Sequence, residues 1–484
     1  MRRYLLLILL LCASLMPQAR AQLTNGQAAD VVLGQADFIS NGHSTTASTM
    51  YYPNSVAVDP TTGKVFVGDV GGNRVLRFGS ATSLASGASA ESVLGQADFT
   101  SSAHAISQTG LQSVYALAFD ASGNLYVSDN TANRVLRYNN ASGKATGAGA
   151  DGVLGQADFT SSAAAVTQNG LNNPRSMAVS STGSLFVADF FGNRILRYDN
   201  AAAKANGANA DAVLGQSTFT TNTSGCTADL LYKPIGAAID AAGSLFISDG
   251  GNFRVVRYDN AGSKANGASA DGVLGQPDLT SDATPSSVNG SMAAAYLAVD
   301  AGGTLYASDI WSNRVLIFSH ASAKANGANA DGVIGHADFT TGSSGVTAST
   351  LNLPQGVAVL NDPGGKLFVA DAYNSRILRY SPGGSLGVHA DAGNQIPAAF
   401  ALAQNYPNPF NPATTISYQL KDAGFVSLSV YDILGREVAR LVNGFQQPGS
   451  KTVSFHADNL QSGVYYYRLS VGSMTSVKQM VLLK

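Results

Sequence analysis

Short apolar runs separated by polar, glycine-rich turns cover most of the chain. The clearest set lies at residues 176–180, 185–189, 194–198 and 212–216, and its runs of about five residues are together rich in Val, Ile, Phe and Tyr. Runs of this length with turn residues between them predict β-strands, here a four-stranded antiparallel meander. The 3.6-residue periodicity of a helix is absent from this part of the sequence.

The meander repeats along the chain. The segment V-L-G-Q-A-D-F, or a close variant of it, begins at six positions spaced by 61 residues once and by 60 thereafter: Val32, Val93, Val153, Val213, Val273 and Val333. A fixed period of this size is typical of repeat architectures. Six sheets must bury their apolar faces on one another, and a circular array does this with few exposed edges. The sequence therefore predicts an all-β fold with a six-bladed β-propeller of four-stranded blades.

The two ends of the repeat region are offset by one strand. A run of the fourth type, residues 30–35, precedes the first complete unit, and the last unit ends after its third run at residues 376–380. We expect the N-terminal strand to pair with the last run and close blade six, because this pairing covers both free sheet edges. The propeller is expected to span residues 30–381.

The character of the sequence changes after Tyr380. Residues 382–404 are rich in Pro, Gly and Ala and predict a linker. Alternating runs follow at residues 426–431, 451–455 and 464–469, with turn signals between them. This spacing predicts a small C-terminal β-sandwich over residues 405–484.

The N-terminal 21 residues have the features of a secretory signal peptide. Arg2 and Arg3 precede the apolar run Leu5–Leu11, and the segment ends in an A-x-A cleavage pattern at Ala21. We expect residues 1–21 to be removed. No later apolar stretch is long enough to cross a bilayer as a helix, so no transmembrane segment is expected in the mature chain.

Charge and cysteine content exclude some classes of function. The loss of Arg2, Arg3 and Arg20 with the signal peptide changes the formal net charge from −2 to −5, and no Lys/Arg-rich run follows. Nucleic acid is therefore not an expected partner. Once Cys12 is removed, Cys226 is the only cysteine, so no intrachain disulfide can form.

The propeller repeat resembles a known family. The pattern G-x-L-[FY]-V-[AS]-D-x-x-x-N-R-[VI]-L-R-[YF], seen at residues 123–138 and 183–198, is similar to the NHL repeat. The resemblance covers about residues 30–381 and implies a six-bladed propeller. Two repeats depart from it, because Phe253 and Ser375 stand where the pattern has Asn.

The C-terminal region resembles the sorting domain of cargo of the type IX secretion system. The similarity rests on N-Y-P-N-P-F-N-P from residue 405, V-Y-D-I-L-G-R-E-V at 430–438, S-G-V-Y-Y-Y-R-L at 462–469 and the terminal M-V-L-L-K. It implies export through the periplasm to the cell exterior or outer surface. It also implies two partners for residues 405–484, the type IX machinery and a sortase-like peptidase that removes the domain.

The turns between second and third strands differ most from repeat to repeat, and they share one rim of the expected propeller with the long connections between blades. Aromatic residues occur in four consecutive turns, and two further residues enter the first strand near this rim. The candidate ligand-binding residues are Phe190, Phe191, Phe253, Trp311, Tyr373, Tyr115 and Arg175. Exposed rings suit sugar faces or peptide side chains. The alternative is that these rings pack between blades.

An aspartate at the end of each second strand recurs five residues before an arginine. The aspartates are Asp69, Asp129, Asp189, Asp249, Asp309 and Asp371, and the arginines are Arg74, Arg134, Arg194, Arg254, Arg314 and Arg376. A catalytic or metal site needs residues that differ around the axis. We therefore expect these groups to secure the turns, through an Asx-type hydrogen bond or an ion pair.

Residues for catalysis are not identifiable. The six histidines lack zinc-ligand spacing, and no G-x-S-x-G motif is present. His43 and His104 lie in connections of adjacent blades and are expected to face solvent, and Cys226 has no neighbouring base in the sequence. We expect a secreted or surface-displayed binding module for a glycan or peptide, with no catalytic residue, metal or cofactor. Two alternatives stay open: a metal-dependent propeller enzyme of the lyase or lactonase type with an axial site, and a passive module of the cell surface.

Overall fold

The structure is a computed structural model that describes residues 22–283, 296–360, 365–382, 400–402, 404–405, 408–420, 424–446, 449–457, 460–472 and 474–483. The predicted signal peptide, residues 1–21, and most of the predicted linker lie outside the described residues. The chain forms two compact units, Met1–Gly387 and Val388–Lys484.

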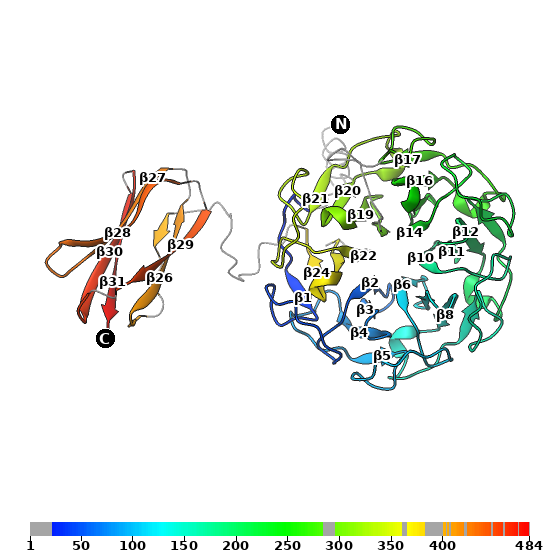
Figure 1. Cartoon of the computed structure of the whole chain (residues 1–484), viewed down its shortest axis with the longest axis horizontal. Helices are drawn as coiled ribbons and strands as arrows, with labels where there is room; N and C mark the ends of the chain where they lie inside the picture. Colours follow the sequence, from blue (N-terminus) through cyan, green and yellow to red (C-terminus); the bar gives the residue numbers. More distant parts are fainter. Residues whose placement is uncertain are drawn as a thin grey trace, which may run out of the picture. The chain divides into compact units, whose positions relative to one another are not determined.

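Six four-stranded antiparallel sheets form a ring in the first unit (Figure 1). Blade 1 contains β2 (Pro53–Val58), β3 (Lys64–Asp69), β4 (Arg74–Ser80) and β5 (Ser92–Leu94). Blade 2 contains β6 (Val114–Phe119), β7 (Leu125–Asp129), β8 (Arg134–Tyr138) and β9 (Gly152–Leu154). Blade 3 contains β10 (Pro174–Val179), β11 (Leu185–Asp189), β12 (Arg194–Tyr198) and β13 (Ala212–Leu214).

The remaining blades repeat this order. Blade 4 contains β14 (Pro234–Ile239), β15 (Leu245–Asp249), β16 (Arg254–Tyr258) and β17 (Gly272–Leu274). Blade 5 contains β18 (Leu297–Val299), β19 (Leu305–Asp309), β20 (Arg314–Phe318) and β21 (Gly332–Ile334). Blade 6 contains β22 (Pro354–Val359), β23 (Leu367–Asp371), β24 (Arg376–Tyr380) and β1 (Val31–Leu33). The predicted all-β fold with a six-bladed β-propeller is confirmed.

Helical structure in the propeller is limited to single 3-10 turns among the described residues. Four of them follow third strands: η1 (Ala141–Gly143), η2 (Ala201–Ala203), η4 (Ala261–Ser263) and η6 (Ala321–Ala323). Three connect a second strand to a third: η3 (Gly250–Asn252), η5 (Ile310–Ser312) and η7 (Ala372–Asn374).

The core lies between adjacent blades. Each first strand contacts the first strands of its two neighbours, so these strands surround the axis of the ring. One cluster joins Phe66 and Val75 of blade 1 to Leu117, Leu125 and Val127 of blade 2. Because both faces of a blade are covered in this way, the second strands of blades 2 to 6 are buried at all five positions. This explains why the strands appear in the sequence as continuous apolar runs.

The N-terminal strand closes the ring, as predicted. β1 pairs antiparallel with β24, and Val32 lies opposite Leu378 in the register. Figure 1 shows blue β1 beside yellow β24, which come from opposite ends of the propeller sequence. An ion pair supports the pairing, since Arg379 Nη2 lies 3.0 Å from Asp30 Oδ2.

The closing segment begins earlier than residue 30. The Asn25 side-chain oxygen accepts a hydrogen bond from the Val333 N–H at 2.9 Å, just as Asn206 does from Val153 at 3.0 Å in an internal repeat. The next residue, Gly26, has a φ of 67°, and a Cβ there would lie 2.9 Å from the Ala337 Cα. The N-terminal segment therefore imitates the connection that precedes a fourth strand as well as the strand itself.

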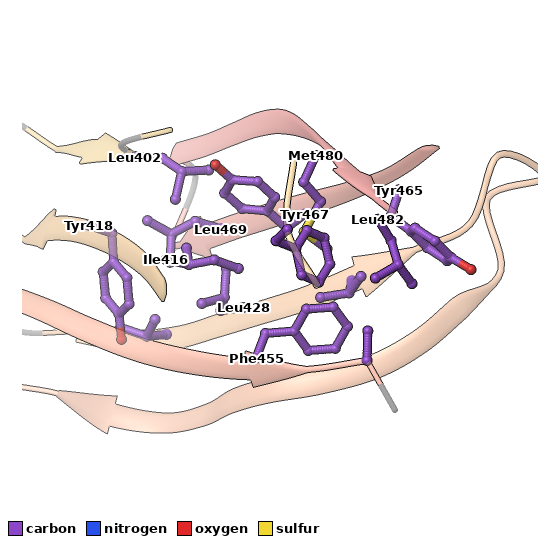
Figure 2. Packing of buried hydrophobic residues seen from close by; sticks show 14 of the residues in the cluster. Leu402, Ile416, Tyr418, Leu428, Phe455, Tyr465, Tyr467, Leu469, Met480 and Leu482 are labelled. Atoms are coloured by element: carbon purple, nitrogen blue, oxygen red, sulfur yellow. The ribbon is translucent and has the colours of Figure 1, made fainter. Parts of the chain in front are cut away.

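The second unit consists of two antiparallel sheets. One contains β25 (Ala401–Leu402), β26 (Ala413–Leu420) and β29 (Gly449–His456). The other has the order β28 (Glu437–Gln446), β27 (Gly424–Tyr431), β30 (Gly463–Val471) and β31 (Met474–Leu482). Figure 2 shows side chains of both sheets, among them Ile416, Phe455, Leu428 and Tyr467, packed in one hydrophobic core. The unit is an all-β domain with one shared core, as the sandwich prediction requires.

Candidate functional site

The repeated aspartate and arginine form an ion pair in every blade. Each arginine Nε lies 2.7–2.9 Å from the aspartate Oδ2, and both side chains are at most 4% exposed. Burial raises the pKa of Asp69 and of Asp189 to about 6, against the opposing effect of Arg74 and Arg194. Asp69 and Asp189 are therefore still mainly ionised at neutral pH, and their ion pairs persist there.

Each pair fastens the turn between the second and third strands to the connections between blades. In blade 3 the Asp189 carboxylate accepts the Asn172 N–H at 2.6 Å, and Arg194 donates to the Phe219 and Gly170 carbonyl oxygens. Equivalent bonds recur in the other blades, for example from Arg254 to Leu279 and Leu230. Each aspartate and arginine thus bonds to the framework of its own blade and of the connections beside it.

Blades 4 and 6 keep the same turn geometry despite their departures from the repeat pattern. Phe253 and Ser375 adopt left-handed φ values of 53° and 51°, close to the 48° of Asn193 in blade 3. The residue before each makes different bonds from those of Asn193: Asn252 and Asn374 donate to a carbonyl of the connection that precedes their blade and to the blade's aspartate. Phe253 is consequently a turn residue.

A group of unlike side chains gathers where the first strands begin. It is called the axial cluster here and consists of Tyr52, Asn54, Tyr115, Arg175, Phe190, Lys233, Tyr296 and Tyr373. The Arg175 guanidinium lies over two rings of the cluster, 4.4 Å from the centroid of Tyr115 and 4.3 Å from that of Phe190. The Arg175 Nε also donates to Asn173 Oδ1 at 3.2 Å. The two cation–π contacts and this hydrogen bond restrict the orientation of the guanidinium.

Two members of the axial cluster meet across the axis. Asn54 Nδ2 donates to the Tyr115 carbonyl at 2.8 Å and to the Tyr296 hydroxyl at 3.0 Å. Asn54 belongs to blade 1 and Tyr296 to blade 5, which are not neighbours in the ring. Burial raises the pKa of Tyr296 to about 12, although Arg175 and Asn54 lower it. The hydroxyl is therefore a neutral hydrogen-bonding group at physiological pH.

The remaining members lie beside these residues. The rings of Tyr52 and Tyr373 meet edge to face with centroids 5.2 Å apart. The pKa of Tyr52 is raised to about 12 by burial and by the neighbouring Tyr373, Tyr115 and Tyr296 hydroxyls. Lys233 Nζ lies 6.0 Å from the Phe190 ring centroid. Side chains from all six blades thus contribute to one cluster.

The backbone at the cluster is held in an uncommon conformation. Tyr52, Asn173, Lys233 and Leu353 have φ values between 49° and 63°, and each directly precedes a proline that opens a first strand. Residues other than glycine rarely adopt this region. Because four blades share the feature, it belongs to the framework. Its consequence is that the side chains of Tyr52 and Lys233 start from fixed positions at the rim.

The structure gathers some of the predicted ligand-binding residues and not others. Tyr115, Arg175, Phe190 and Tyr373 belong to the axial cluster, and Phe191 is 48% exposed beside Phe190, with ring centroids 4.9 Å apart. Phe253 and Trp311 make no ring contact with any residue that the structure describes, and the Trp311 side chain is 70% exposed.

Sequence reasoning missed Tyr52, Lys233 and Tyr296. Tyr296 carries a readable signal, because the equivalent position in the other blades has only small residues: Ser55, Ala116, Ser176, Gly236 and Gly356. A Cβ on Gly356 would lie 2.7 Å from the Ser55 Cα, so adjacent first strands approach closely at this level. One large ring at such a position must extend toward the axis.

The histidines and the cysteine lie apart from the axial cluster. His43 stacks on Tyr51 with centroids 4.5 Å apart, and His104 Nδ1 lies 3.0 Å from the Gln112 carbonyl oxygen. The Cys226 thiol donates to the Ser281 carbonyl at 3.2 Å, and burial raises its pKa. Within the described ranges, no group of three His, Cys, Asp or Glu side chains is placed to hold a metal ion.

A hollow of about 400 Å³ lies elsewhere, in the connection between blades 1 and 2. Its lining includes Gln96, Ser107 and Thr146 together with alanines and glycines, and it contains no charged or aromatic side chain. It offers a ligand few distinguishing contacts. The axial cluster, with rings, hydroxyls and a cation from different blades, is the chemically richer candidate.

Comparison with known protein families identifies the C-terminal unit. Residues 404–483 match the family model described as secretion system C-terminal sorting domain. The chain is therefore an exported β-propeller protein whose C-terminal domain directs it to the cell surface or the extracellular space, as the sequence predicted. No helix among the described residues is both long enough and apolar enough to cross a membrane.

Several solved structures are similar in fold. PorZ, a surface component of the type IX secretion system of Porphyromonas gingivalis, is 15% identical over 89% of this chain and 51% of its own, with a TM-score of 0.36. Virginiamycin B lyase from Staphylococcus aureus is 12% identical over 68% and 83%, with a TM-score of 0.36. Regucalcin from Agrobacterium tumefaciens, a calcium-binding protein, is 12% identical over 72% and 97%, with a TM-score of 0.39.

This chain thus spans about half the length of PorZ. At these identities, the similarities concern the fold and carry no information about ligands. No functionally curated protein matches the chain in sequence. The resemblance of the repeats to the NHL family stays a prediction.

Proposed function

We propose that the exported propeller is a binding module for a glycan or peptide and that the axial cluster is its ligand site. The observation that carries the proposal is the position of the Arg175 guanidinium over the rings of both Tyr115 and Phe190. Arginine and aromatic side chains held rigidly in this way lose little conformational freedom when a ligand binds. They therefore supply contacts at a low entropic cost.

The asymmetry of the cluster supports binding over a purely structural role. Residues that secure the framework recur in every blade, as the buried aspartate and arginine do. The residues of the axial cluster differ from blade to blade, and Tyr373 is 55% exposed at the rim. Aromatic rings with a polar atom, as in tyrosine, suit ligands that have both apolar faces and hydroxyl or amide groups.

We further propose that residues 405–484 engage the type IX machinery and are then removed by a sortase-like peptidase. The match of residues 404–483 to the sorting-domain model supports this assignment.

The binding proposal is tested with Tyr115→Ala and Tyr373→Ala variants of the exported protein on an array of glycans and peptides. We expect the wild-type protein to bind at least one class of ligand and each variant to lose about tenfold in affinity, since a buried aromatic contact contributes on the order of 1–2 kcal/mol.

Trp311→Ala is the matched control, because it removes an exposed ring of the same rim that lies outside the axial cluster. Its affinity should stay within about twofold of the wild type. If Trp311→Ala reduces binding and the two tyrosine variants do not, the axial cluster is not the ligand site.

A further inference from the structure

Two cations of the axial cluster have no acidic partner. Lysines elsewhere in the propeller pair with carboxylates, for example Lys204 with Asp211 and Lys264 with Asp271, each at 2.7 Å. Arg175 and Lys233 are different, since no Asp or Glu oxygen of the described residues forms an ion pair with either side chain. Both cations lie near the ring of Phe190, at 4.3 and 6.0 Å from its centroid.

The buried carboxylates beside these cations are already paired: Asp189, opposite Pro174 in the sheet, pairs with Arg194, and Asp249, opposite Pro234, pairs with Arg254. The groups that act on the pKa of Tyr52 are three other tyrosines, and those that act on Tyr296 are Arg175, Asn54 and Tyr115. No carboxylate is among them. The axial cluster is therefore a local positive region on a propeller whose other cations are largely neutralised, and a negative group placed there gains electrostatic energy without displacing an existing ion pair.

The geometry of Arg175 suits a planar or branched anion. Its guanidinium is restrained by contacts with the rings of Tyr115 and Phe190, and its Nε donates to Asn173. Arginine held in one orientation can present the remaining N–H groups to a carboxylate or sulfate in a forked arrangement. Lys233, whose Nζ lies 6.0 Å from the Phe190 ring centroid, supplies a second positive charge.

The rim favours a sugar chain over a peptide main chain. Backbone N–H groups at the rim are already bonded within the protein: Phe190 N–H donates to Asn173, Tyr373 N–H to Asn352 and Gly251 N–H to Tyr232. A peptide that adds to a sheet needs free N–H and C=O groups along an edge. The axial cluster instead offers side chains, namely neutral phenol hydroxyls for sugar hydroxyls and the exposed ring of Tyr373 for a sugar face.

We infer that the axial cluster binds an acidic glycan and that Arg175 and Lys233 recognise its carboxylate or sulfate groups. This inference rests on the proposed function and specifies the ligand class of the same site.

The test compares charged glycans with neutral counterparts of the same sugar. Isothermal titration calorimetry of the exported protein is performed with oligogalacturonate, its methyl ester, dextran sulfate and dextran, and with oligoglutamate as the acidic peptide. We expect at least one acidic glycan to bind about tenfold or more tightly than its neutral counterpart. The preference should weaken as salt rises from about 0.05 to 0.5 M, because the charges are partly exposed.

Two variants localise the effect. Arg175→Gln removes one charge, and Lys233→Met removes the second charge without altering the stack of Arg175 on its two rings. Each should reduce the ratio of the affinity for the acidic glycan to the affinity for its neutral counterpart about tenfold. Lys264→Met is the matched control, because Lys264 lies in an ion pair with Asp271 outside the axial cluster, and it should bind as the wild type does.

Three results would overturn the inference: equal affinity for charged and neutral glycans, binding of oligoglutamate but of no acidic glycan, and unchanged acid preference in both the Arg175 and Lys233 variants. The first and third leave the proposed binding function intact if the tyrosine variants still lose their ligand. If no glycan or peptide binds at all, the proposed function itself fails.

Discussion

The buried arginine of each blade is held by the same kinds of partner, and each partner fastens a different part of the chain. In blade 3 the Asp189 carboxylate belongs to the end of the second strand, Phe219 to the segment after the fourth strand, and Gly170 to the approach to the first strand. One arginine side chain thus fixes the positions of three segments relative to one another. The hydrophobic effect alone is not directional and would not fix these positions. The network also explains how polar groups are tolerated at 0% exposure.

Replacing Asp189 by alanine should destabilise the propeller strongly. The substitution leaves the Arg194 guanidinium buried without its carboxylate, so we expect the free energy of unfolding to fall by about 3–5 kcal/mol. Urea denaturation of the full chain measures the loss.

Asp271→Ala is the matched control for this substitution. It breaks an ion pair in which Asp271 is 34% and Lys264 20% exposed. The loss in the free energy of unfolding should therefore stay below about 1 kcal/mol. Equal losses in the two variants would mean that the buried pair contributes no more than an exposed one.

Single residues of the axial cluster were only partly predictable. Tyr115 and Arg175 were identified because they stand at a position that varies between repeats. A 60-residue alignment places Ala295 at that position in blade 5, and Tyr296 one residue later is the side chain that meets Asn54. Trp311 is the opposite case, because its position in a variable turn predicted a ligand contact. In the structure its ring is exposed and contacts no other ring among the described residues. Which rings converge depends on side-chain direction, which repeat spacing does not encode.

At the scale of elements, the ring of blades depends on the short strand β1, which closes it. β1 has only three residues, yet Val31 and Leu33 are buried in a core shared with blade 1, and Val32 in one shared with blade 5. The strand therefore joins two interfaces between blades as well as completing one sheet. This element was predictable from the sequence, because the offset of one strand between the two ends of the repeat region has no use in an open array.

The substitution Val32→Asp should open the ring. Val32 is fully buried, and its replacement removes an apolar contact and places a carboxylate in the core, so we expect a loss of at least about 3 kcal/mol in the free energy of unfolding. We also expect self-association through the freed edge of β24, visible by size-exclusion chromatography.

Ile39→Asp provides the comparison, since Ile39 follows the same segment and is 64% exposed. It should change stability by no more than about 0.5 kcal/mol. A Val32→Asp protein that remains monomeric and as stable as the Ile39 variant would show that the ring does not depend on β1.

At the scale of the whole molecule, the chain combines a repeat propeller with a domain for export. The sorting domain was predictable because its sequence motifs are specific, and several of their apolar residues, such as Val430 and Tyr467, are buried in the core of the domain. Its strand β28 was not predicted, and the reason is visible in the structure. None of its residues is fully buried, so it lacks the strict alternation that identifies a half-buried strand.

Deletion of residues 405–484 should retain the propeller in the periplasm. The N-terminal signal still directs the chain across the inner membrane, whereas the domain that directs passage to the exterior is missing. Cell fractionation and immunoblotting locate the product, and the full-length Asp271→Ala protein serves as the exported control. Recovery of the truncated propeller in the medium at the control level would refute the sorting role of the domain.

The pairing of β1 with β24 joins segments 349 residues apart, as the bond between Arg379 and Asp30 illustrates. Contacts of such long range form late. During translation, β1 can pair with β24 only after the last repeat has left the ribosome. The export domain is synthesised after that repeat. A polypeptide truncated within the propeller therefore lacks both the partner of its first strand and its route to the exterior, so unfinished molecules remain where cellular proteases can remove them.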